Sequence, residues 1–81
     1  LTGERRTELV KQVKKIGEEY KVAIRNVRRD ANELLKRLKK DKEVSEDEMF
    51  RLQEHIQKST DAYISSIDDI VAGKEKEVTE V

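Results

Sequence analysis

Apolar residues recur every three or four positions along the first half of the chain, which is the spacing of one face of an α-helix. No strong helix breaker interrupts this pattern before about Asp41, and Glu4 stands where the helix dipole favours an acid. Thr2 is the candidate N-cap. We therefore predict a helix over about residues 3–40. Its apolar positions are Leu9, Val13, Ile16, Tyr20, Ala23 or Ile24, Val27, Ala31, Leu34 and Leu38.

A polar turn is expected at residues 41–45, because a capping box follows it. In this motif Ser45 would accept a hydrogen bond from the backbone N–H of Glu48, and the Glu48 carboxylate would reach back to the Ser45 N–H. A second helix is predicted over about residues 46–80, with Gly73 marking a bend or a close backbone contact. Its apolar positions are Met49, Leu52, Ile56, Thr60, Tyr63, Ile64, Ile67, Ile70, Val71 and Val78.

Two helices of similar length with a short connection predict an all-α fold, a long antiparallel helical hairpin. The apolar stripe of the first helix extends from Ile16 round to Leu35, which is wider than the seam of a two-stranded coiled coil. We therefore expect residues 1–81 to be two helices of a three-helix bundle, a fragment of one helical-bundle domain. The missing helix would come from the rest of the parent chain or from self-association.

The composition agrees with long helices: 44% of the residues are charged, 35% are hydrophobic, and there is no proline. Disorder is the competing explanation for so much charge, but it predicts no apolar periodicity. The sequence has no cysteine, no apolar run that approaches the ~18–20 residues of a membrane span, and no signal-peptide pattern. We expect a soluble chain without a membrane partner, and the lack of cysteine is compatible with a reducing cytosol without proving one.

The net charge of zero conceals a strong asymmetry. Residues 1–42 carry 14 basic and seven acidic side chains, a net charge of +7, and residues 43–81 carry four basic and 11 acidic ones, a net charge of −7. Such a division suggests a half that faces a polyanion and a half that is solvated. The alternative is that the two halves attract each other as antiparallel helices. The two explanations are compatible, because a helix has more than one face.

Catalytic and metal-binding motifs are absent from the sequence. It has no glycine-rich phosphate loop, and a lone His55 cannot form a metal site. The adjacent acids Asp68 and Asp69 are more simply solvated groups than an acid–base pair, because nothing near them would bury them and shift the pKa of either. Ser65 and Ser66 lack a base partner. We predict that the chain is not an enzyme and uses no metal or cofactor.

A basic ridge follows the side of the first helix that lies opposite its apolar stripe. At about 100° per residue, Arg28 falls at the border between the ridge and the stripe, and Asn26 falls at the far edge. Arginine at the centre of such a ridge favours bidentate contacts to phosphate. We name Arg25, Arg28, Arg29, Lys21 and Asn26 as candidate RNA-binding residues. The basic ridge comprises Lys14, Lys21, Arg25, Arg29, Lys36 and Lys39.

Three interpretations of this ridge remain open. Aromatic residues are few, so stacking on single strands is not expected, and the backbone of folded RNA or a duplex fits better. Alternatively, the ridge is only solvated, with Glu18 and Glu33 as ion-pair partners, and the chain is a structural coiled-coil or scaffold module. A helix on a membrane surface fits less well, because the apolar stripe is needed for packing and has no tryptophan anchor.

Five segments, distributed in order over essentially all 81 residues, carry a specific pattern. They are Leu1–Val10 (LTGERRTELV), Val22–Ala31 (VAIRNVRRDA), Lys40–Glu48 (KDKEVSEDE), Gln57–Asp61 (QKSTD) and Lys74–Val81 (KEKEVTEV). With these segments the chain resembles the ribosome recycling factor family. Gly3 and Thr79 depart from the pattern expected of the family, and neither departure touches the basic ridge.

The resemblance implies the second and third helices of a long three-helix bundle, with the first helix and an inserted β-rich domain absent from these residues. It implies a translation factor that splits post-termination ribosomes together with elongation factor G. The partners would be the large-subunit rRNA and that factor, and the location would be the cytoplasm of a bacterium, or an organelle matrix or stroma. Arg25, Arg28 and Arg29 match the family's arginines placed against the RNA, and Arg28 is expected to have the largest single effect. Residues 40–45 would form the tip of the bundle.

Overall fold

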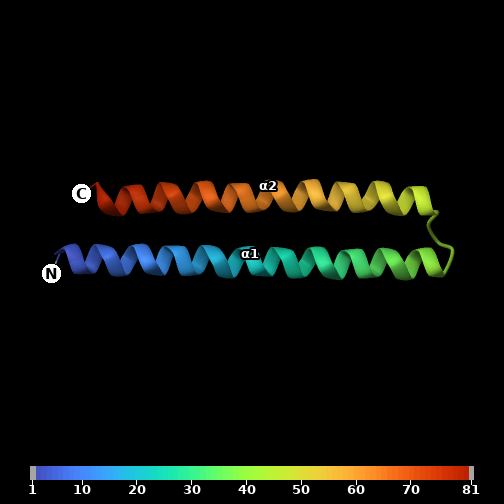
Figure 1. Ribbon diagram of the computed structural model, residues 1–81, viewed down its shortest axis with the longest axis horizontal. Helices are drawn as coiled ribbons and strands as arrows, with labels where there is room; N and C mark the ends of the chain where they lie inside the picture. The colour runs from blue at the N-terminus through green and yellow to red at the C-terminus, as the bar shows by residue number, and fades with distance from the viewer. Residues whose placement is uncertain (1, 81) are drawn as a thin grey trace.

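The computed structural model describes residues 2–80, which form two long helices and a tight turn (Figure 1). Helix α1 spans Thr2–Lys40 and helix α2 spans Glu46–Thr79, and the two run antiparallel side by side with both chain ends at the same end. The prediction of an all-α helical hairpin is confirmed. The helices begin and end within one residue of the expected bounds. The expected capping role of the Thr2 side chain lies outside what the structure describes.

The hairpin is a single flat layer of two helices. It measures 62 × 15 × 9 Å, and its radius of gyration is 18.4 Å. A compact domain of this length would have a radius of gyration of about 12 Å. In this layer each helix packs against one other helix, and residues 2–80 contain no third element that would close a core.

Few side chains are therefore fully covered within the described residues. The buried apolar side chains are Leu35 and Met49, each 7% exposed, and both lie in the half of the hairpin that contains the turn. Thr60 is also buried, and its hydroxyl donates a hydrogen bond to the carbonyl oxygen of Ile56 at 2.7 Å. That bond satisfies the polar group inside an otherwise apolar contact.

The predicted apolar stripe of α1 divides into two parts. Ile24, Ala31, Leu35 and Leu38 are half-buried or buried along the seam with α2. The remaining large apolar side chains of the stripe, apart from the half-buried Val13, stay exposed, because one neighbouring helix covers only part of a face more than 100° wide. They are Leu9, Ile16, Tyr20, Val27 and Leu34.

The turn reverses the chain in five residues without glycine or proline. The Lys42 N–H donates to the carbonyl oxygen of Lys39 at 3.0 Å, and the Glu43 N–H donates to that of Leu38 at 2.9 Å. These two bonds are the Schellman ending of a helix, and they place Lys42 in the left-handed region with φ of 61°. The Ser45 hydroxyl then accepts from the Glu48 N–H at 3.1 Å, as predicted. Within the described residues the reciprocal bond of the capping box is not formed.

Apart from Gly3 in the first turn of α1, two glycines lie within the helices, and they differ in their surroundings. Gly17 is buried, and a Cβ added there would lie 2.6 Å from Cγ2 of Val71 on α2. A Cβ added at Gly73 would meet nothing within 4 Å. The expectation that Gly73 marks a close backbone contact is therefore wrong, and the close approach of α1 to α2 is found at Gly17 instead. A glycine at a tight helix crossing lets the backbones approach, whereas an exposed helical glycine only weakens its helix.

The two glycines provide a matched pair of substitutions. Gly73→Ala should raise the free energy of unfolding by about 0.5–1 kcal/mol through helix propensity alone. Gly17→Ala brings the same propensity gain but forces the stiff Val71 side chain or the helices to move, and overpacking of this kind costs about 1–3 kcal/mol. Urea unfolding, monitored by circular dichroism at one protein concentration, should give Gly17→Ala a free energy of unfolding lower than that of Gly73→Ala by this overpacking cost. Equal stabilisation by both would contradict the close approach, and adding Val71→Ala should relieve Gly17→Ala.

Candidate nucleic-acid interface

The basic ridge of α1 has an inner edge, which faces α2, and an outer edge, which faces away from it. The inner edge consists of Lys14, Lys21 and Lys39, and each of these lysines reaches an acidic side chain of α2 or of its first turn. The Nζ–carboxylate distances are 3.8 Å for Lys14–Glu75, 2.8 Å for Lys21–Asp68 and 3.6 Å for Lys39–Glu46. Part of the opposite charge of the two halves therefore forms ion pairs between α1 and α2.

Lys21 is the most strongly held of these lysines. Its ammonium lies 2.8 Å from both Asp68 and Glu18, and its side chain is only 15% exposed. The hydrogen bond to Asp68, followed by the one to Glu18, raises the pKa of Lys21 above its ordinary value. Lys21 therefore stays charged at neutral pH. Its charge is directed at the two carboxylates, so the structure places this candidate residue in a contact between helices.

Arg28 occupies the next position in the same series. Lys14 and Lys21 are seven residues apart, as are their partners Glu75 and Asp68, so the repeat would bring Arg28 opposite Asp61. Asp61 instead accepts a hydrogen bond from Nε2 of Gln57 at 2.9 Å. Within residues 2–80 the Arg28 guanidinium has no ion-pair partner.

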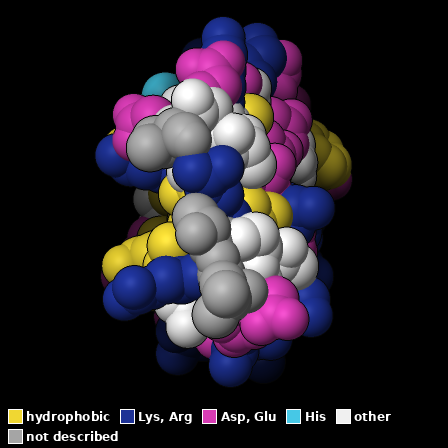
Figure 2. Space-filling view, turned by 90° about the vertical axis from the view of Figure 1, so that its left-hand side faces the viewer, with side chains coloured by type: hydrophobic (Ala, Val, Ile, Leu, Met, Phe, Trp, Pro, Cys, Tyr) yellow, Lys and Arg dark blue, Asp and Glu magenta, His cyan; other side chains and the backbone are white. Residues whose placement is uncertain are grey.

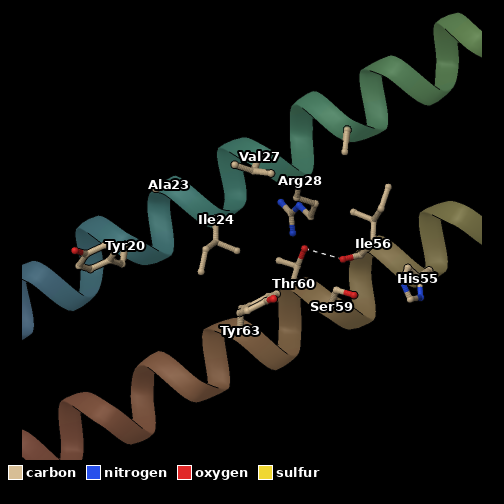
Figure 3. A pocket seen from close by; sticks show the side chains of 11 residues that line it. Tyr20, Ala23, Ile24, Val27, Arg28, His55, Ile56, Ser59, Thr60 and Tyr63 are labelled. Atoms are coloured by element: carbon tan, nitrogen blue, oxygen red, sulfur yellow. Dashed lines mark hydrogen bonds between the residues drawn. The ribbon is translucent and has the colours of Figure 1, made fainter.

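Figure 3 shows the Arg28 side chain pointing from α1 into the gap between the helices, toward Thr60 of α2. Arg28 is half-buried, and the surfaces around it come mainly from apolar side chains such as Ile24 and Ile56. A guanidinium held there by its packed stem keeps its charge and five donors available to an incoming anion.

The outer edge of the ridge carries three exposed cations, Arg25, Arg29 and Lys36. Arg29 lies 3.7 Å from the neighbouring Asp30, a pair in which both side chains are more than half exposed and which contributes little. Arg25 and Lys36 make no ion pair with another described residue. Asn26 is exposed and lies about 100° from Arg25 around the helix, at the margin of this surface. The structure thus brings Arg25, Arg29 and Lys36 to one free surface.

An apolar groove runs along the opposite flank of the hairpin. One part, of about 410 Å³, is lined from Tyr20 to Ala31 on α1 and from His55 to Tyr63 on α2. A second part, of about 330 Å³, continues from Tyr20 toward the chain ends. Viewed from that end, hydrophobic side chains reach the surface on the left-hand flank where the helices meet (Figure 2). The groove and the outer edge of the ridge therefore lie on different sides of α1, and Arg28, which also lines the first part of the groove, lies between them.

The described residues offer neither a metal site nor a membrane-spanning segment. They contain no group of three or more histidine, cysteine or acidic side chains placed to hold a metal ion. Neither helix has a segment long and apolar enough to cross a membrane.

Comparison with known proteins identifies the family. The family model described as "Ribosome recycling factor" matches residues 1–78 of the chain. The chain belongs to the ribosome recycling factor family. A protein of that name from Desulfotalea psychrophila is 64% identical over all 81 residues, and those from Symbiobacterium thermophilum and Bacillus pumilus are 60% and 58% identical over the same length. In each comparison the chain spans 44% of the relative's length.

Membership of the ribosome recycling factor family confirms the resemblance found in the sequence. One of the five segments that carried the resemblance, Val22–Ala31, lies in the middle of α1 and contains both outer-edge arginines and Arg28. The sequence analysis did not predict the close contact at Gly17 or the division of the ridge into an inner and an outer edge. The heptad spacing of Lys14 and Lys21, repeated by Asp68 and Glu75, is the signal that could have indicated the inner edge.

Proposed function

We propose that this chain is the rRNA-facing helical arm of a ribosome recycling factor, with the outer edge of the basic ridge against the RNA of the large ribosomal subunit. The observation that carries the proposal is the row of exposed, weakly paired cations Arg25, Arg29 and Lys36 on a rigid helix. These residues span about 16 Å along the axis at 1.5 Å per residue. Arg28 adds a charge-assisted contact at the inner margin, and Asn26 a polar contact at the outer margin.

The chemistry of this surface suits a phosphate backbone. A straight helix whose cations lie one and two turns apart can contact several phosphates of one backbone without reading base edges. Few aromatic side chains are present, so stacking on unpaired bases would contribute little. Folded ribosomal RNA offers the required dense negative charge in a fixed shape.

In the proposed function, the arm contributes binding and positioning and catalyses no reaction. Splitting of post-termination ribosomes, together with elongation factor G, would need the remaining length of the protein. The groove beside Tyr20 and Val27 would then be covered by a further helix of that longer chain. The site of action would be the cytoplasm of a bacterium, or an organelle matrix or stroma.

The competing hypothesis is a structural coiled-coil module whose ridge is only solvated. It is favoured by the three interhelix ion pairs, which use Lys14, Lys21 and Lys39 for folding rather than for a ligand. The two hypotheses differ in what the outer edge does. Only an RNA contact makes binding to large ribosomal subunits depend on Arg25 and Arg29.

The test is the affinity of the chain for large ribosomal subunits over a series of salt concentrations. Arg25→Ala and Arg29→Ala should each weaken binding and reduce the slope of log affinity against log salt by about one, the effect of losing one phosphate contact. Arg37→Ala is the matched control, because Arg37 is an exposed arginine of α1 about 120° away from Arg25. Binding that is insensitive to salt, or equally reduced by all three substitutions, would refute the RNA contact.

A further inference from the structure

The register of the two helices brings four polar side chains together across the seam. One heptad beyond the ion pair of Lys21, Arg28 comes opposite Asp61. Asn32 follows Arg28 by four residues and Gln57 precedes Asp61 by four, so Asn32 and Gln57 also come opposite each other. We call these four side chains the polar cluster: Arg28 and Asn32 of α1, with Gln57 and Asp61 of α2.

In the structure only part of the polar cluster has hydrogen-bond partners. Nε2 of Gln57 donates to Oδ1 of Asp61 at 2.9 Å, and this bond lies within α2. Oδ1 of Asn32 is buried and accepts no hydrogen bond from the described residues. The Arg28 guanidinium, which has five N–H donors, makes no ion pair within residues 2–80. A buried acceptor without a donor is uncommon in a folded protein, because it destabilises the fold.

The same four side chains have a second arrangement, in which each of them has a partner. If the Gln57 amide turned to Asn32, it would donate to the buried Oδ1. Asp61 would then be free to pair with Arg28, as the acid one heptad away pairs with its lysine. Figure 3 shows Arg28 already pointing across the seam toward Thr60, the residue next to Asp61. The orientation of Gln57 therefore decides where the exposed Asp61 carboxylate is held.

We propose that Gln57 is a positioning residue, which keeps the Asp61 carboxylate away from Arg28 and so leaves the guanidinium open to an RNA phosphate. When Gln57 turns to Asn32, Asp61 pairs with Arg28 and competes with the phosphate. The affinity for RNA is then scaled by the fraction of chains in which Arg28 is open. The inference rests on the proposed RNA contact of Arg28 and adds to it an internal anion that competes for the same guanidinium.

The first test is the affinity of the chain for large ribosomal subunits after substitution of either of two glutamines. Gln57→Ala should weaken binding about twofold, the size of one side-chain hydrogen bond between residues four apart. Adding Asp61→Ala to Gln57→Ala should restore at least the original affinity, because the competing carboxylate is gone. Gln53→Ala is the control, because Gln53 is a half-buried glutamine of α2 one turn earlier, outside the polar cluster. Equal losses from the two glutamines, or no rescue by Asp61→Ala, would overturn the proposal.

Loss of Asp61 also removes a negative charge, which by itself favours binding to RNA. Glu54 controls for this effect: it lies one heptad before Asp61 on α2, is exposed, and pairs with Lys58 at 3.1 Å. Asp61→Ala should raise the affinity for large subunits more than Glu54→Ala does. The difference should vanish when both substitutions are made in Arg28→Met. A difference that persists without the arginine would overturn the proposal.

The last test uses no RNA, so it separates this inference from the proposed function. In the free chain with nitrogen-15-labelled arginine, the side-chain NMR signals of Arg28 are assigned by their loss in Arg28→Met. Gln57→Ala should slow the rotation of the Arg28 guanidinium and give a nuclear Overhauser effect between the Arg28 and Asp61 side chains. Gln53→Ala should leave these signals as they are in the unchanged chain.

The two possible failures give different results. Unaltered Arg28 signals in Gln57→Ala would overturn the inference even where Arg28 binds RNA. Altered Arg28 signals in a chain whose RNA affinity does not depend on Arg28 would support the exchange of partners and refute only the RNA contact.

Discussion

Replacing Leu35 with alanine should remove most of the stability of the hairpin. Leu35 is one of two buried apolar side chains in residues 2–80, at 7% exposure, and it lies on the seam with α2. Truncating a buried leucine costs about 2–5 kcal/mol through lost transfer energy and the cavity that remains. A layer of two helices has little other buried area to offset this loss. Urea unfolding, monitored by the helical circular-dichroism signal, should show a transition at a much lower urea concentration, or no folded baseline at all.

The adjacent leucine provides the control for this substitution. Leu34 is 48% exposed, so Leu34→Ala changes the same chemistry in the same helix with little loss of burial. We expect a change below about 1 kcal/mol, measured at a concentration at which the chain does not associate. Comparable losses from the two substitutions would mean that the seam does not lie where the structure places it.

Replacing Arg28 with alanine should weaken binding to large ribosomal subunits by about 1–3 kcal/mol, the expected effect of losing a charge-assisted contact. The effect should exceed that of Arg25→Ala or Arg29→Ala. The reason is that the Arg28 guanidinium is half-buried, is held by packing against α2, and has no ion-pair partner among residues 2–80. A fixed, partly desolvated cation loses less entropy and less hydration when it meets a phosphate than a mobile exposed one.

Arg28 also lies between the helices, so its substitution must be separated from a loss of folding. Arg28→Met keeps most of the apolar stem and removes the charge. We expect Arg28→Met to match Arg28→Ala in ribosome affinity while retaining more of the free energy of unfolding. Unchanged affinity in both variants would exclude Arg28 from the RNA contact, and restored affinity in Arg28→Met would assign it to packing.

Much of the architecture could be predicted from local signals in the sequence. The period of the apolar residues gave both helices, and Ser45 with Glu48 marked the start of the second one. These features depend on neighbours three or four residues apart, which the sequence displays directly. The antiparallel pairing could also be predicted, because a turn of only five residues brings two consecutive helices side by side in opposite directions.

The assignment of faces could not be predicted in the same way. Hydrophobicity shows that Val27 and Leu35 are both apolar, but it does not show which of them points at α2. That direction depends on how the two helices are rotated about their axes, which side-chain shape decides. Gly17 contributes by lacking a side chain, and Lys21 by reaching across to Asp68. Neither contribution is visible in an apolar pattern. The close contact lies at Gly17 and not at Gly73, and Lys21, a candidate RNA-binding residue, is paired with α2.

The length of the hairpin has a mechanical consequence. Its 62 Å rod is held by ion pairs distributed from Lys14–Glu75 near the chain ends to Lys39–Glu46 near the turn. Such a rod behaves as a lever: a small rotation imposed where the chain ends lie becomes a large sideways travel of the turn. A rotation imposed at the end where α1 begins and α2 ends therefore displaces Lys42 in the turn at the opposite end of the arm.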